Sequence, residues 1–331
     1  MKDLLVLLKQ GNKSALIAAL VNAVIAVIKG GTYVLTGNVA MFAETMHSIG
    51  DSANQFFVFT GSALSKKAPT DRFPGGFGRL VHLVLLGAVL IVGIMSYETI
   101  IEGYHHIIHP VESEGFLLNV LVLGTAVILE AFVLYKAMKE LLHDAGVEAK
   151  GLEIIPKSFA SFKKGKPATK LVFLEDIVAT LGGLLAIMAI IISKFTPFHE
   201  AEGIASILIG VMMFFVVGKV FLDNAAGVLG EADEYMEQKI GDIAMKDSGV
   251  KDIQMVTVLK EGEDLHVELE IEIDPNLTIA EADNIKDRLE ERIMAEKGVT
   301  EVTIEFDEDD GVTKWSSVKD QQFTEEKKAR E

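Results

Sequence analysis

The chain of 331 residues contains no cysteine. Disulfide bonds are therefore excluded, and so are metal sites built from thiolates. Any metal ion that this protein binds must be held by His, Asp, Glu or Asn side chains or by backbone oxygen atoms. The search for a metal site is thereby directed to the eight histidines and to the acidic residues.

Basic residues are scarce in the last hundred positions. Residues 231–331 hold 30 Asp and Glu against 13 Lys and Arg, whereas the whole chain holds 48 against 31. The first 230 residues therefore hold 18 of each sign, and the net charge of −17 lies entirely in the C-terminal part. Such an acidic segment repels nucleic acid and anionic surfaces, so we expect no nucleic-acid partner. Cations and basic proteins fit it instead.

The chain is both apolar and charged. Its mean hydropathy is +0.34, and 24% of its residues are charged. A soluble domain rarely combines the two, so the composition predicts two unlike parts. We expect no cleavable signal peptide and no mitochondrial targeting peptide, because neither pattern is visible in the first residues. These residues, MKDLLVLLKQGNKS, read as a short amphipathic stretch before the first apolar run.

Long apolar runs predict a helical membrane bundle. A helix needs about 20 apolar residues to cross the hydrocarbon core of a bilayer. Six segments qualify, although the second, fourth and fifth carry ionisable residues. The predicted spans are Ser14–Leu35, Asn38–Leu64, Phe77–Ile101, Phe116–Leu142, Lys170–Ser193 and Ala201–Leu222.

Lysine and arginine are concentrated in alternate linkers of this bundle. They precede the first span and fill the linkers after the second and fourth, while the opposite linkers contain only Lys194. Basic loops stay on the cytoplasmic side of a membrane, so both termini are expected there. The linker of residues 147–170 is long and basic, and we expect it to be mobile.

After the sixth span the periodicity changes. Residues 265–273 alternate between apolar and polar side chains, which predicts a half-buried strand. A preceding strand, a helix over Asp233–Lys246, a helix with Thr278 and Glu281 as a capping box, and a final strand complete the pattern α-β-β-α-β. We therefore predict a transmembrane domain of residues 1–229, a ferredoxin-like α+β cytoplasmic domain of residues 230–308, and a disordered tail of residues 309–331.

Ionisable side chains inside the predicted spans indicate a function. Such groups are costly in a membrane. His47 and Asp51 lie one turn apart on one helical face with Glu44, and Glu175 and Asp176 are adjacent in the fifth span. Interhelical hydrogen bonds or a salt bridge would be the ordinary explanation. We see no matching Lys or Arg at that depth, however, and uncompensated carboxylates favour a cation site.

Four sequence motifs, taken in order, resemble the cation diffusion facilitator family. LTGNVAMFAETMHSIGDSANQ resembles the second membrane helix of that family, FLEDIVATLGG its fifth helix, FPGGFGR its loop motif, and AEGIASILIGV the start of its sixth helix. The Glu-Asp pair, the Asn54-Gln55 pair and the long basic linker are most similar to the branch related to zinc transporter nine. The resemblance covers about residues 12–306.

The resemblance implies a homodimer with six helices per protomer and a cytoplasmic αββαβ domain. It implies export of Zn²⁺, or less often Mn²⁺ or Fe²⁺, in exchange for protons. Among the family's four metal ligands, His47, Asp51 and Asp176 match, whereas the fourth position holds Val172, which cannot bind metal. We expect Glu175 to substitute. Glu44 and Glu130 are held in reserve.

Other polar residues carry weaker signals. His266 on the wet face of a strand is expected to be solvated, and His105, His106 and His109 to mark a helix end. The loop motif has Phe73 where the family has histidine, which leaves Asp71 and His82 without a third partner. Lys29 is expected to reach the interface or to pair with a carboxylate.

Together these observations predict a secondary transporter that exports a divalent metal ion, zinc foremost, from the cytoplasm by alternating access in a plasma membrane. Imidazole with carboxylates suits Zn²⁺ and admits Mn²⁺, Fe²⁺ or Co²⁺. A transport-inactive sensor or scaffold remains an alternative because of Val172. A membrane metalloenzyme is a further alternative, but no general base or substrate pocket is evident, so we predict that the protein is not an enzyme.

Overall fold

The computed structural model describes residues 7–111, 114–162, 167–262 and 264–315. The chain divides into two compact units, which are considered separately. One comprises Met1–Leu64 with Leu83–Asn224, and the other comprises Ser65–His82 with Ala225–Glu331.

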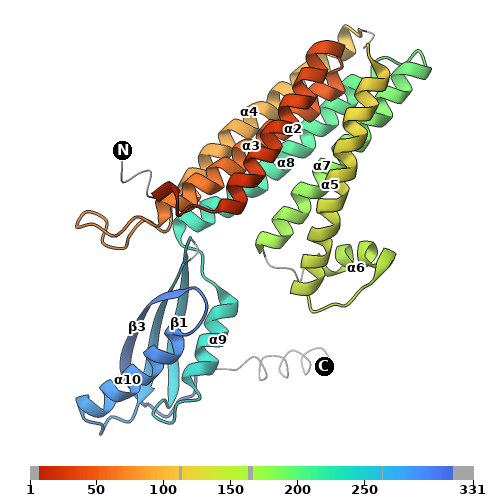
Figure 1. Cartoon of the computed structure of the whole chain (residues 1–331). Coiled ribbons are helices and arrows are strands. Elements are labelled where there is room, and N and C mark those ends of the chain that lie inside the picture. Colours follow the sequence, from red (N-terminus) through yellow and green to blue (C-terminus); the bar gives the residue numbers. More distant parts are fainter. Residues whose placement is uncertain (1–6, 112–113, 163–166, 263, 316–331) are drawn as a thin grey trace. The chain divides into compact units, whose positions relative to one another are not determined.

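Long helices build the first unit (Figure 1). By length and composition, five of its described helices can cross a membrane, and α3, which carries Glu44, His47 and Asp51, is not among them. The structure therefore supports a multi-pass membrane protein. The long helices are α2 (Lys13–Thr36), α3 (Val39–Ser65), α4 (Leu80–Ile108), α5 (Phe116–Asp144), α7 (Pro167–Phe195) and α8 (Ala201–Leu229).

The ends of α2 follow from local chemistry. The Asn12 side chain accepts a hydrogen bond from the backbone N–H of Ala15 and so caps the N-terminus of the helix. Gly37 ends the helix with φ of 65°, a left-handed conformation that favours glycine. The chain then turns directly into α3, so the first two helices are close neighbours in sequence with opposite directions.

Small residues let the helices approach closely. A Cβ atom on Gly103 of α4 would lie 2.7 Å from the carbonyl oxygen of Gly203 in α8, and one on Gly203 would lie 2.6 Å from the carbonyl oxygen of Gly103. The two backbones therefore touch at this crossing, as membrane helices often do at small residues. The apolar centre of the unit is formed by α3, α5, α7 and α8 through Ala40, Met41, Ala43, Leu123, Ala186, Ile190, Ile209 and Met213.

The linker between α5 and α7 is partly helical. A 3₁₀ turn, η1 (Gly151–Glu153), leads into α6 (Ile154–Ser161), which contacts α5. The expectation of a mobile linker is thus wrong for this stretch, because Ile154 is buried against the ends of α5 and α7. Residues 163–166 lie outside the described residues.

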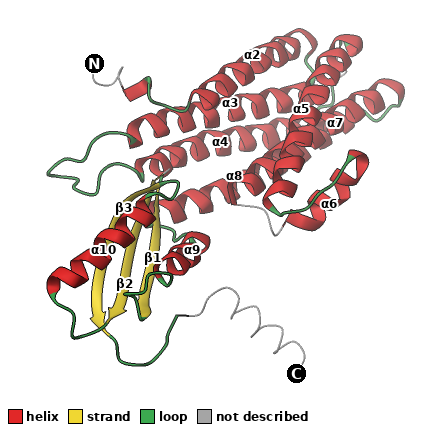
Figure 2. Ribbon diagram, turned by 60° about the horizontal axis from the view of Figure 1, so that its bottom comes forward, coloured by secondary structure: helices red, strands yellow, loops and turns green. Residues whose placement is uncertain are grey.

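The second unit contains a three-stranded sheet with two helices (Figure 2). The strand order is β1-β2-β3, with β1 antiparallel to β2 and β2 parallel to β3. The expected order of elements is confirmed, while the closer likeness to a ferredoxin fold stays a prediction. The elements are α9 (Glu234–Ala244), β1 (Asp252–Glu261), β2 (Asp264–Ile273), α10 (Ile279–Met294) and β3 (Val299–Glu308).

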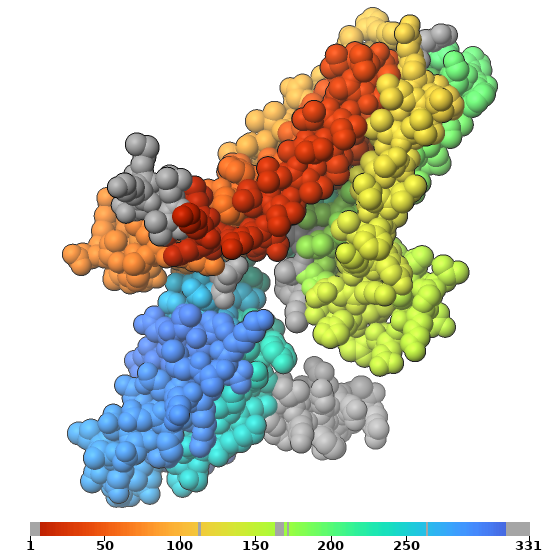
Figure 3. All heavy atoms as spheres, in the orientation of Figure 1, coloured from red at the N-terminus to blue at the C-terminus, as the bar shows by residue number. Residues whose placement is uncertain are grey.

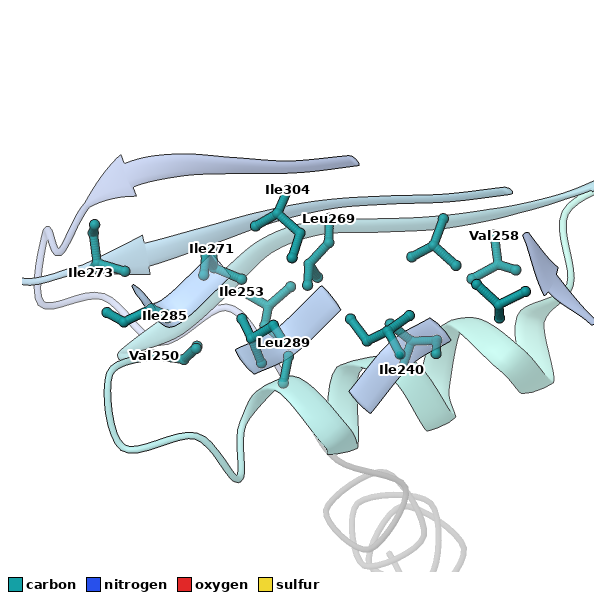
Figure 4. Close-up of a cluster of buried hydrophobic side chains, with 14 of the residues drawn as sticks. Ile240, Val250, Ile253, Val258, Leu269, Ile271, Ile273, Ile285, Leu289 and Ile304 are labelled. Carbon is teal, nitrogen blue, oxygen red and sulfur yellow. The ribbon is translucent and has the colours of Figure 1, made fainter. Parts of the chain in front are cut away.

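The alternation in β2 produces the core of this unit. Leu269 and Ile271 are buried on the face covered by the helices, with Ile240 of α9 and Leu289 of α10 packed against them (Figure 4). Burial of this apolar surface stabilises the sheet–helix packing. The capping box is also confirmed, because the Thr278 side chain accepts from the Glu281 backbone N–H while the Glu281 carboxylate accepts from that of Thr278.

A buried carboxylate links the two helices of this unit. The Asp247 side chain, 3% exposed, accepts hydrogen bonds from the guanidinium of Arg288 at 2.9 and 3.1 Å, and Arg292 lies 3.3 Å away. The hydrogen bonds from Arg288 hold the pKa of Asp247 below its ordinary value. The segment after α9 is thereby tied to α10.

Two further segments belong to the second unit. Residues 65–82 contact the β1–β2 turn, where Arg79 forms an ion pair of 3.0 Å with Glu261 and a Cβ on Gly262 would lie 2.7 Å from the carbonyl oxygen of Gly78. Residues 309–315, expected to be disordered, are held in place because Asp252 accepts backbone hydrogen bonds from Lys314 and Trp315. The remainder of that predicted tail, residues 316–331, lies outside the described residues.

Candidate functional site

Helix α3 places three ionisable side chains on one face. Glu44, His47 and Asp51 recur at intervals of three and four residues, so they lie one above another along the helix. His47 is buried with 8% of its side chain exposed, whereas Asp51 is 40% exposed. The His47 Nε2 atom lies 3.4 Å from Asp51 Oδ2 and has no hydrogen-bond partner within the described part of the chain. The imidazole is thus close to a carboxylate while its nitrogen stays free to bind another group.

A cavity lies beside these residues. Its volume is about 40 Å³, enough for an ion or a few water molecules. One side is polar, formed by His47, Asp51 and Asn54 of α3 with Glu175 of α7, and the other side is apolar. The remaining lining residues are Gly50, Val89, Val92, Val178, Met213, Val216, Val217 and Val220. A polar wall opposite an apolar one is the arrangement expected of a small-ligand site.

Helix α7 adds two carboxylates. Glu175 lines the cavity, and its Oε1 accepts a hydrogen bond of 3.5 Å from the Asn54 side chain. Asp176 lies outside the lining but interacts electrostatically with Asp51 and His47. Its Oδ2 atom is buried, with no hydrogen-bond partner among the residues that the structure describes. The two carboxylates and Asp51 therefore share one region of like charge, which a cation would relieve.

The four predicted ligands are only partly brought together. His47, Asp51 and Glu175 line one cavity, with Asp176 in electrostatic range. Among the described residues, no group of three or more His, Asp or Glu side chains is arranged to hold a metal ion. The four-ligand site stays a prediction. Val172 is 47% exposed, and Glu175 is the residue of this stretch that reaches the cavity.

A buried ion cluster confirms one of the two alternatives for Lys29, the pairing with a carboxylate. The Lys29 ammonium of α2 is fully buried and lies 2.8 Å from Glu44 Oε2 and 3.2 Å from Glu130 Oε1 of α5. The expectation that no Lys matches the carboxylates at this depth is therefore wrong for Glu44. Glu44 and Glu130, the reserve metal ligands, already have a positive partner. A lysine between Ile28 and Gly30 in an apolar run is the signal that indicates such a pairing.

Two glycines of α7 make room for this cluster. A Cβ on Gly182 would lie 2.8 Å from Glu44 Oε1, and one on Gly183 would lie 3.4 Å from Glu130 Oε2. Both carboxylate oxygens are buried and lack hydrogen-bond partners among the described residues. A larger residue at Gly182 would displace the Glu44 carboxylate, whereas one at Gly183 would first meet Val127 at 2.4 Å.

Two of the other histidines, His106 and His266, have structural surroundings. His106, near the end of α4, is buried, and its Nε2 lies 3.3 Å from the backbone oxygen of His199. The His266 side chain is only 25% exposed and lies between Glu301 at 3.2 Å and Glu261 at 3.7 Å. It is therefore less solvated than we expected from the sequence. Two carboxylates at these distances orient the ring of His266 within the second unit.

Comparisons with known proteins agree with this architecture. Residues 15–228 match the family model of the cation efflux transmembrane domain, and residues 232–309 match the cation efflux protein cytoplasmic domain, a dimerisation domain. The chain belongs to the cation efflux family. The family, also called the cation diffusion facilitators, consists of transporters, as the sequence motifs predict.

Several curated relatives are similar to this chain, with low sequence identity. The proton-coupled zinc antiporter SLC30A9 of mouse mitochondria is 26% identical over 255 residues, covering 76% of the chain and 44% of the relative. The probable cation efflux protein Rv2025c of Mycobacterium tuberculosis is 25% identical, covering 83% and 76%. The uncharacterized transporter YdbO of Bacillus subtilis is 23% identical, covering 92% and 97%.

The relatives also support the predicted branch. SLC30A9 antiporters of mouse and human are among the matches, which places the chain with the zinc-transporter-nine-like members. The chain spans less than half the length of these mammalian relatives.

Proposed function

We propose that the protein exports a divalent transition-metal ion, zinc foremost, in exchange for protons. The observation that carries this proposal is the cavity between α3, α4, α7 and α8, whose polar wall presents an imidazole and two carboxylates. Such donors bind Zn²⁺ and distinguish transition metals from Mg²⁺ and Ca²⁺. The similarity to proton-coupled zinc antiporters supports the choice of ion and of counter-ion.

The roles of the residues follow from their charge. Asp51 and Asp176 supply the negative charge that makes entry of a dication favourable. His47 supplies a nitrogen ligand, and Glu175 takes the position that Val172 leaves empty. Metal ions and protons compete for the same lone pairs on these groups, so binding of one releases the other. Movement of the helices about this site then exposes it to each side of the membrane in turn.

The proposal includes α3 as a sixth membrane span. Its 27 residues are long enough to cross a bilayer, and its ionisable residues Glu44 and His47 are buried within the bundle rather than facing lipid. With six spans both termini lie on one side. The basic linkers favour the cytoplasmic side of a plasma membrane, although the SLC30A9 relatives are mitochondrial by name. The dimerisation domain supports assembly as a homodimer.

Metal-stimulated proton flux in proteoliposomes tests this function. Zn²⁺, Mn²⁺, Fe²⁺ and Co²⁺ are compared on the wild type and on Asp51→Asn and Asp176→Asn. We expect flux with zinc, reduced at least tenfold in both variants, because each loses a charge that compensates the dication. Asp223→Asn is the matched control, since Asp223 pairs with Lys219 on α8 and does not line the cavity.

Two results would contradict the proposal. Absence of flux with every metal, from folded and inserted protein, would favour a sensor or scaffold. Flux that is equal in the wild type and both aspartate variants would show a transporter whose site lies elsewhere. Isothermal titration of Zn²⁺ into the same variants separates loss of binding from loss of movement.

A further inference from the structure

Helix α6 is fixed on one side and uncovered on the other. Its inner residues Ile154 and Ser158 are 1% and 0% exposed, and Ile154 packs among Met138, Leu141 and Leu142 of α5 and Phe173 of α7. The segment is therefore docked onto the ends of two membrane helices. Figures 1 and 3 show it beside the end of α5, with its outer side at the molecular surface.

The outer side of this segment is apolar. Leu152 is 85% exposed, Ile155 46% and Phe159 54%. Their spacing of three and four residues places them on one face. The Phe159 ring also touches Phe173, with 5.3 Å between ring centres, so its orientation is fixed by α7. An ordered apolar stripe without a protein partner among the described residues needs another covering.

Aromatic and lysine side chains near the end of α5 indicate the level of the membrane surface. Phe132 and Tyr135 are exposed on this helix, with the ammonium groups of Lys136 and Lys139 over their rings at 4.6 and 4.8 Å. Aromatic rings paired with lysines typically mark the boundary between acyl chains and headgroups. Met138, which contacts α6, belongs to the same turns. The outer stripe of α6 thus lies at the depth of the interface.

The charge around α6 complements anionic headgroups. Within the described part of residues 150–170 there are three lysines against the single acid Glu153, which pairs with Lys157 at 2.8 Å. The net positive charge therefore comes from Lys150 and Lys170, which flank α6, and an amphipathic helix beside such lysines lies in the plane of the interface. We propose that η1 and α6 form an interfacial segment that inserts Leu152, Ile155 and Phe159 among the acyl chains, with anionic lipid headgroups bound by the flanking lysines.

Tryptophan quenching tests this proposal. The chain contains one tryptophan, Trp315, so Trp315→Phe provides a silent background for Phe159→Trp. The full-length protein is reconstituted into vesicles of phosphatidylglycerol with phosphatidylcholine brominated on its acyl chains. We expect emission from position 159 to be quenched at least twofold. Phe132→Trp, on lipid-exposed α5, is the quenched reference, and Tyr235→Trp, in the C-terminal unit, is the unquenched one.

The outcomes separate the possible coverings. Quenching at position 159 no stronger than at position 235 overturns the proposal, and blue-shifted emission without quenching would assign the stripe to a protein partner such as a second copy. Equal quenching in vesicles of phosphatidylcholine alone overturns the assignment to anionic lipid. If Trp315→Phe does not fold, the same variant with Trp315 retained is compared with the wild type. The readout needs no metal, so it is independent of the proposed transport.

Discussion

Removal of the Lys29 ammonium is the sharpest test of how the bundle carries its acidic residues. Lys29→Met keeps the length and apolar stem of the side chain while deleting its charge. Glu44, with a fully buried side chain, then has no positive partner, and neither does Glu130, whose side chain is 20% exposed. Breaking a buried ion pair by removing one partner costs about 3–5 kcal/mol, because the remaining charge stays desolvated.

This cost corresponds to a measurable loss of thermal stability. A domain of this size loses about 2–4 °C in Tm for each kcal/mol, so Lys29→Met should lower the Tm by on the order of 10 °C. The change in Tm is measured by heating the purified protein in detergent and then analysing it by size-exclusion chromatography. Lys29→Met combined with Glu44→Gln and Glu130→Gln should recover most of it, since no uncompensated charge remains.

A surface ion pair provides the control. Lys219 pairs with Asp223 at 2.7 Å on α8, but its side chain is 47% exposed, so Lys219→Met should cost at most about 1 kcal/mol. The reasoning is refuted if Lys29→Met destabilises no more than Lys219→Met. It is also refuted if the triple variant is as unstable as the single one, because the loss then comes from packing rather than from unpaired charge.

Further predictions concern α7 and the C-terminal unit. Gly182→Ala should destabilise the bundle, because its Cβ would meet Glu44 Oε1 at 2.8 Å. Gly218→Ala has open space around it and should instead stabilise α8 by about 0.5–1 kcal/mol. Thermal unfolding of both variants measures the two effects. Asp247→Asn should cost about 1.5–3 kcal/mol at pH 7, as followed by Trp315 fluorescence during urea unfolding of the C-terminal unit, because the hydrogen bonds from Arg288 lose their charged acceptor. The folded pKa of Asp247 lies below its ordinary value of 3.8. This stabilisation is therefore complete above about pH 4 and is lost as the pH falls through the folded pKa. In Asp247→Asn, the free energy of unfolding should lack this decrease at low pH.

The helices and strands could be predicted because each one follows from a local pattern of residues in the sequence. The apolar run Ser14–Leu35 matches α2 within one residue at each end, and Thr278 with Glu281 marks the start of α10. The same holds for β2, where alternation decides which face is buried. Such features depend on neighbours in sequence, so the sequence alone suffices to predict them.

The partners of Lys29 and helix α6 could not be predicted in the same way. The sequence gives a carboxylate as one of two expected partners for Lys29, but the choice of Glu44 and Glu130 depends on how three helices pack, and periodicity within each helix does not determine that. An eight-residue helix such as α6 gives too short a pattern to be distinguished from a loop, and its inner face becomes recognisable only against α5. For the candidate site, the sequence indicated the residues that share a cavity but not the distances between them.

The membership of residues 65–82 in the second unit changes how a truncated protein should be judged. The chain passes between the two units three times, near residues 64, 82 and 224. A protein ending at Gly230 would therefore lack Glu261 and Gly262, the partners of Arg79 and Gly78, and would leave the α3–α4 connection bare. Failure of such a truncation would report the loss of the partners of residues 65–82, and not only the absence of a dimerisation domain.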